Sequence, residues 1–173
     1  MVRLLKLRFR VSKDQIGKFV YTGMSIKSTE GFIYINQNQY SQELEQIPKE
    51  AEDGKEEQKK TTLRGAVGKL LYLNLTRPDL SFRTNLLSRI PAGTDMNEKI
   101  KEARELIEDA RKNPLEIRYG RLAPMKDITI EVYADASFGS AEKGFKSTEG
   151  FVILLRGVGE RCAPIAWRSR VIS

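Results

Sequence analysis

The spacing of apolar residues changes character twice along this chain, and that change limits the folds open to it. Between residues 61 and 112, apolar side chains recur every three or four positions, as in helices with one buried face. In residues 18–37 and 128–169 the apolar and β-branched residues instead follow the spacing of strands. Strands, helices and strands that occupy separate stretches of one chain predict an α+β fold.

The segment before the helices is expected to contain two strands and one helix. Residues 18–28 and 31–37 are rich in β-branched and aromatic residues, and a short turn separates them. Residues 37–47 have helical spacing, and Pro48 follows where such a helix would end. This combination predicts a small antiparallel sheet with a helix at its end.

Two further N-terminal stretches are less regular. Residues 48–60 are polar, charged and free of large apolar side chains, which indicates a linker or exposed loop. Residues 2–10 fit a strand or a helix equally well. The helical alternative would place four basic residues on one face: Arg3, Lys6, Arg10 and Lys13.

Three helices are expected in the middle of the chain. The first follows a cap at Thr61 and Thr62, and the second carries Pro78 in its first turn. The third begins at Asp95, with Glu98 three residues later in the arrangement of a capping box.

The C-terminal region predicts three strands, at residues 128–135, 147–155 and 163–169. The middle one is a nearly continuous apolar run, which is typical of a central strand covered on both faces. With no helix after them, these strands leave one sheet face uncovered and prone to aggregation. Cys162 is expected to be a buried, inert thiol and Trp167 a packing residue.

The composition excludes several classes of chemistry. The 173 residues include no histidine and one cysteine, so Ser–His and Cys–His nucleophiles and internal disulfides are excluded. A zinc site is not expected either, whereas magnesium held by carboxylates stays open. No signal peptide, membrane span or small-molecule substrate is indicated, and a single thiol suits an intracellular location in cytoplasm or nucleus.

The positive charge is concentrated in two segments. The formal net charge is +7; residues 1–27 carry seven basic and one acidic side chain, and residues 61–94 carry five and one. Between them, residues 28–60 carry four basic and eight acidic side chains. Basic blocks that share a face suit a polyanionic partner, whereas for any single basic residue a solvated surface position is the alternative.

Asp135 is the most suggestive single residue. It ends an alternating strand and is followed by two small residues, a position suited to a magnesium ligand. An aspartate that opens a turn explains the same pattern. Spacing alone leaves both explanations open.

Three blocks of sequence together resemble a known family. Residues 63–89, LRGAVGKLLYLNLTRPDLSFRTNLLSR, are similar to the TRPD-centred segment of Pol polyproteins of copia-type LTR retrotransposons. Upstream, FVYTGMSIKSTEGFIYINQNQY resembles the same proteins. Downstream, VYADASFG, KSTEGFVILL and PIAWRSR resemble the opening strands of their ribonuclease H domain.

The resemblance implies three parts of a reverse transcriptase. Residues 1–60 would be the end of the polymerase palm with a linker, and residues 61–120 a helical thumb or connection segment. Residues 121–173 would be the first three antiparallel strands of a truncated ribonuclease H-like domain. The family's first metal-binding aspartate matches Asp135, although Ser137 and Phe138 replace the usual Asp and Trp after it.

The same resemblance sets expectations for activity. Ribonuclease H holds two Mg²⁺ ions with about four carboxylates, of which this chain matches one, and no Tyr-x-Asp-Asp polymerase motif occurs. We therefore expect an inactive fragment without productively bound Mg²⁺. Residual nonspecific binding to an RNA·DNA hybrid or duplex is expected through Arg3, Lys6, Arg10, Arg64, Lys69, Arg77 and Arg83.

Two alternatives stay open at this point. In the first, the chain is a working segment of a larger RNA-directed DNA polymerase and ribonuclease H, completed by flanking sequence. In the second, the chain is a domesticated, non-enzymatic interaction protein. The sequence contains no feature that favours this second alternative.

Overall fold

A computed structural model describes residues 17–91, 93–122, 124–137, 147–159 and 161–172. The segment 2–10, with the predicted basic residues Arg3, Lys6 and Arg10, lies outside these ranges. Within them, no helix is both long enough and apolar enough to cross a membrane.

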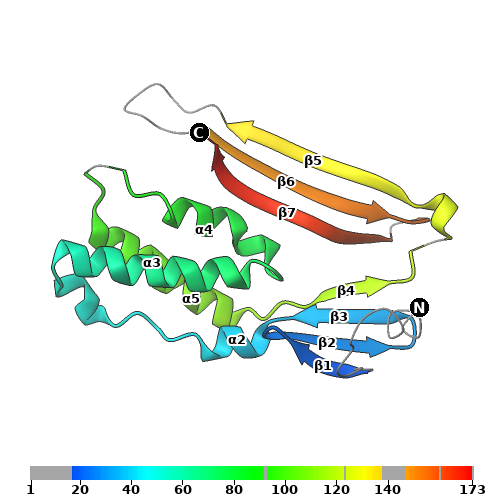
Figure 1. Cartoon of the computed structure of the whole chain (residues 1–173), viewed down its shortest axis with the longest axis horizontal. Coiled ribbons are helices and arrows are strands. Elements are labelled where there is room, and N and C mark those ends of the chain that lie inside the picture. Colours follow the sequence, from blue (N-terminus) through cyan, green and yellow to red (C-terminus); the bar gives the residue numbers. More distant parts are fainter. Residues whose placement is uncertain (1–16, 92, 123, 138–146, 160, 173) are drawn as a thin grey trace, which may run out of the picture.

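Two antiparallel sheets flank a group of helices (Figure 1), which confirms the α+β class. The first sheet has the order β1-β2-β3-β4 and the second the order β5-β6-β7. Helix α4 packs against β7, so the second sheet lies beside the helices. The strands are β1 (Lys18–Tyr21), β2 (Met24–Thr29), β3 (Phe32–Asn36), β4 (Ile117–Gly120), β5 (Thr129–Ser137), β6 (Ser147–Arg156) and β7 (Cys162–Ile172). The α-helices are α2 (Asn38–Glu43), α3 (Glu56–Leu73), α4 (Ser81–Leu87) and α5 (Met96–Lys112).

The predicted strand at 18–28 is instead a hairpin of two strands. Thr22 and Gly23 have positive φ angles of 46° and 73°, the backbone conformation that tight hairpin turns need. The hydroxyl of Tyr72 donates a hydrogen bond to the carbonyl of Thr22, and a Cβ at Gly23 would lie 2.7 Å from that hydroxyl. The turn therefore depends on a contact with α3, which strand spacing does not reveal.

Strand β4 is absent from the sequence-based prediction. Its four residues are too few to show alternation, yet they complete the first sheet by pairing with β3. Since β4 follows α5, the first sheet joins the two ends of the helical region.

The helix boundaries differ from the prediction in three places. Pro78 lies in a short 3-10 helix, Pro78–Leu80, and α4 begins only after it, at Ser81. Helix α2 ends at Glu43, well before Pro48, and α3 begins at Glu56 rather than after Thr61 and Thr62. The expected linker therefore includes a 3-10 helix, Lys49–Asp53, and the first turn of α3. The third helix begins as predicted, because the Asp95 carboxylate accepts hydrogen bonds from the two backbone N–H groups that follow at positions 97 and 98.

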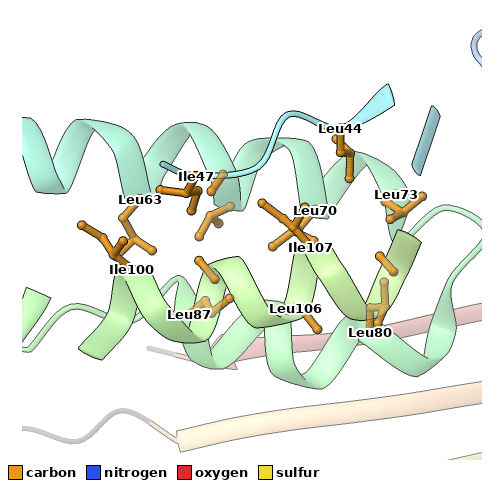
Figure 2. Packing of buried hydrophobic residues seen from close by; sticks show 14 of the residues in the cluster. Leu44, Ile47, Leu63, Leu70, Leu73, Leu80, Leu87, Ile100, Leu106 and Ile107 are labelled. Atoms are coloured by element: carbon orange, nitrogen blue, oxygen red, sulfur yellow. The ribbon is translucent and has the colours of Figure 1, made fainter. Parts of the chain in front are cut away.

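The helices enclose one hydrophobic core (Figure 2). Helices α3 and α5 face each other through fully buried leucine and isoleucine side chains, and α4 and the segment after α2 add to the cluster. Four side chains at its centre have no exposed surface or almost none: Leu63, Leu70, Ile100 and Ile107.

The second sheet is only partly covered. Strand β6 is central, as predicted, but its side chains are half-buried rather than covered on both faces. On the edge strand β5, Ile130 and Val132 are 67% and 61% exposed. Trp167 packs as expected, and its indole N–H donates to the Asn74 carbonyl at 2.7 Å. Cys162 is exposed, so the prediction of a buried thiol is wrong: it begins β7, beside the β6–β7 turn.

Candidate nucleic-acid interface

The basic residues predicted on the helices differ in their exposure and in their partners. Arg64 lies exposed on α3, and Lys69, further along the same helix, pairs with Glu45 at 3.0 Å. On α4, an Arg83 guanidinium nitrogen lies 2.6 Å from an Asp109 carboxylate oxygen. A hydrogen bond from Asn113 and then the Arg83 contact hold the pKa of Asp109 below its usual value.

Arg77 is not on the surface at all. Its side chain is 3% exposed, and its guanidinium donates to both carboxylate oxygens of Asp79 and to the Ala110 carbonyl. A guanidinium with these partners stabilises the fold and presents nothing to a phosphate, so we remove Arg77 from the predicted contact set.

Asp135 is exposed near the end of β5. One carboxylate oxygen accepts a hydrogen bond from the backbone N–H of Ala136 at 2.9 Å. The residue lines an open groove of about 660 Å³ between the second sheet and α4, together with the apolar rings of Phe82 and Trp167. In the described ranges, no three acidic, cysteine or histidine side chains come together as a metal site. The described residues around Asp135 therefore do not by themselves fit a pair of magnesium ions.

A different set of basic side chains shares one face of the first sheet. Residues that pair directly across antiparallel strands project from the same face. Lys18 pairs with Lys27, Lys27 with Tyr34, and Tyr34 with Arg118, so these four form a row across all four strands. Phe32 lies two residues before Tyr34 and shares this face. We call these five residues the sheet face.

The cations of the sheet face rest on its aromatic rings. The Lys27 ammonium lies 5.8 Å from the centre of the Tyr34 ring, and the Arg118 guanidinium 5.1 Å from that of Phe32. The two rings are 6.1 Å apart. Among the described residues, no carboxylate forms an ion pair with Lys18, Lys27 or Arg118, and all three are exposed. Their charges are thus available to an external anion.

Sequence reasoning missed this face for an identifiable reason. Lys27 and Arg118 lie 91 positions apart, and only the pairing of the unpredicted β4 with β3 brings Arg118 into the row. The sequence of the first hairpin did contain part of this pattern, because the alternation of side chains along a strand places Lys27 and Thr29 on one face. The pattern could be recognised only after the structure showed that the turn at Gly23 divides residues 18–28 into two strands.

Comparisons with known proteins find three transposon proteins. The chain is 29% identical over 113 residues to the retrovirus-related Pol polyprotein from transposon RE2 of Arabidopsis thaliana, and 27% identical over 113 residues to that from transposon RE1. It is 32% identical over 114 residues to a transposon Ty5-1 protein of Saccharomyces cerevisiae. Each match covers 64% of this chain, but only 7% of the two polyproteins and 33% of the yeast protein.

No protein-family model and no solved structure matches the chain.

Proposed function

Because this chain is related to the Pol polyproteins of copia-type retrotransposons, we propose that it is a Pol segment that binds nucleic acid nonspecifically. The sheet face is the observation that carries this proposal. It presents three cations, which have no acidic partner in the part of the chain that the structure describes, beside two aromatic rings. Phosphate contacts made by lysine and arginine supply most nonspecific affinity for nucleic acids.

The dimensions of the sheet face suit a polynucleotide backbone. Neighbouring strands are about 4.8 Å apart, so a row across four strands spans about 14 Å. That length is about four times the axial rise of about 3.4 Å between successive phosphates of one duplex strand. Three cations therefore meet several phosphates of a bound strand, without any contact that reads a base.

We propose the family's domain assignment for the described residues. Residues 17–60 would belong to the end of the palm, residues 61–120 to a thumb or connection segment, and β5–β7 to a ribonuclease H-like sheet. The separate three-stranded sheet after the helices supports this division.

On the same assignment, Asp135 is the equivalent of the family's first metal ligand, and Mg²⁺ is the ion it would help to hold. Two-metal chemistry needs several carboxylates around one scissile phosphate. Among the described residues, the Asp135 carboxylate accepts a hydrogen bond from the Ala136 N–H and belongs to no group of three acidic, cysteine or histidine side chains that could hold a metal ion. We therefore propose that this chain by itself cleaves no nucleic acid and extends no primer.

A salt titration tests the binding proposal. Fluorescence anisotropy with a labelled RNA·DNA hybrid is expected to show affinity that falls as salt rises. The triple variant Lys18→Ala, Lys27→Ala, Arg118→Ala is expected to reduce the slope of log K against log salt by about 2.7, at about 0.9 per duplex phosphate contact.

Two exposed lysines without ion pairs provide the control. The variant Lys49→Ala, Lys101→Ala removes charge outside the sheet face and is expected to change the slope little. Binding that is absent at low salt, or insensitive to salt, would contradict the proposal. Cleavage of the hybrid in the presence of Mg²⁺ would contradict the proposed lack of nuclease activity.

A further inference from the structure

A groove of about 840 Å³ lies where the two sheets approach each other. Its lining comes from the β2–β3 turn, the end of β4 and the β6–β7 turn, three segments far apart in the sequence. The polar and aromatic side chains among them are Phe32, Arg118, Arg121, Arg161 and Cys162. Phe32 and Arg118 also belong to the sheet face, so the groove continues that surface.

The described lining of the groove carries three arginines and no carboxylate. None of its three arginines forms an ion pair with a described carboxylate. One guanidinium nitrogen of Arg161 donates to the backbone carbonyl of Arg121 at 3.4 Å, which holds the two arginines near each other. The other N–H groups of these arginines have no carboxylate partner among the described residues, and guanidinium groups match the geometry of phosphate.

Close backbone contacts shape the groove. A Cβ at Gly157 would lie 2.5 Å from the Leu122 carbonyl oxygen, so only glycine lets the β6–β7 turn approach this segment. A Cβ at Gly120 would lie 3.0 Å from the Phe32 ring, so the missing side chain there makes room for the ring. The hydroxyl of Tyr119 donates to the Pro164 carbonyl at 2.8 Å and further ties β4 to β7.

We propose that this groove binds unpaired, single-stranded nucleic acid, with phosphates on Arg121 and Arg161 and a base stacked on Phe32. The inference rests on the proposed nucleic-acid binding. It adds that the groove binds single-stranded rather than double-stranded nucleic acid. Phe32 is 38% exposed, which leaves ring surface for a ligand. Bases inside a duplex already stack on their neighbours, whereas an unpaired base is free to stack on an aromatic side chain.

The first test compares two probes on the full chain. Anisotropy is measured with a labelled oligothymidylate of about 12 nucleotides and with a duplex of equal length. The variant Arg121→Ala, Arg161→Ala is expected to weaken single-strand binding about tenfold or more and to lower its salt slope by about 1.4, at about 0.7 per contact. Duplex binding is expected to change less than about threefold. The Lys49→Ala, Lys101→Ala variant is the charge-matched control.

The second test separates stacking from charge. Phe32→Leu keeps an apolar side chain in place but removes the ring, and it is expected to weaken single-strand binding about fivefold or more. Because Phe32 also belongs to the sheet face, the far-UV circular dichroism spectrum of the same variant reports whether the sheet is intact. An equal loss for both probes would overturn the role of Phe32 as a stacking platform.

The third test uses Cys162, the sole cysteine of the chain, which is exposed and lines the groove. Bound oligothymidylate is expected to slow alkylation of Cys162 by iodoacetamide several-fold, whereas bound duplex is expected to leave the rate close to that of the free protein. Unchanged alkylation at saturating single strand would overturn the proposed site.

These outcomes distinguish the two proposals. Salt-dependent binding that survives unchanged in the Arg121→Ala, Arg161→Ala variant would support binding at the sheet face and overturn the groove. If the chain binds neither the oligothymidylate nor the duplex, both proposals are overturned.

Discussion

Replacing Arg77 with methionine is expected to destabilise the helices and to leave nucleic-acid binding unchanged. Methionine keeps an unbranched apolar side chain in the same space but removes the guanidinium. That group donates to the Ala110 carbonyl at 3.2 Å, inside the last turn of α5. The usual donor to this carbonyl would be the backbone N–H of residue 114, which is a proline and has none. Arg77 therefore satisfies an acceptor that the helix itself leaves unpaired.

The size of the effect follows from burial. A hydrogen bond from a charged group contributes about 1.5–3 kcal/mol, and its loss leaves a carbonyl unpaired where Ala110 is fully buried. The ion pair with Asp79, whose side chain is 41% exposed, adds less than about 1 kcal/mol. Together these give an expected loss of about 2–4 kcal/mol in the free energy of unfolding.

Urea unfolding followed by tryptophan fluorescence measures this loss. Trp167 is the sole tryptophan, and its hydrogen bond to Asn74 places it near the start of the segment that carries Arg77. Arg83→Met is the matched control: its ion pair with Asp109 is about half exposed, so a loss below about 1 kcal/mol is expected.

The reasoning would be refuted by the opposite pattern. If Arg77→Met unfolds at the same urea concentration as the unmodified chain, Arg77 does not support the fold as its burial indicates. A salt slope reduced by about 0.9 in that variant would show that Arg77 contacts phosphate after all.

Three further outcomes are expected. The pKa of Asp109 lies below its value in the unfolded chain, so the Asp109 carboxylate stabilises the fold above about pH 4, and this stabilisation is lost as pH falls through the folded pKa. The urea midpoint is expected to drop in this pH range, and to drop less in Asp109→Asn. Leu70→Ala, at a side chain with no exposed surface, should cost about 2–5 kcal/mol in urea unfolding. Limited proteolysis followed by mass spectrometry should cut near the exposed edge strand β5 before it cuts α5, and simultaneous cleavage of both would contradict this.

Local sequence patterns predicted those parts of the fold that depend on neighbouring residues. Asp95 caps α5 as expected, because the cap needs only its own backbone N–H groups. The central place of β6 was evident from its apolar run. The hairpin at Gly23 and the strand β4 were missed, since each is stabilised by partners more than forty residues away, Tyr72 and β3.

For the candidate site too, some properties were predictable from the sequence and others depended on the tertiary structure. Composition alone excluded histidine chemistry and indicated an anionic partner, because counts of charges and side-chain types do not depend on how the chain folds. Which basic residues lie exposed on one face depended on the tertiary structure. Folding buried Arg77 beneath the end of α5 and aligned Lys18, Lys27 and Arg118 across a sheet. The physical reason is that strand pairing and helix packing join distant segments, and only this joining decides whether a charge meets a carboxylate, a carbonyl or open solvent.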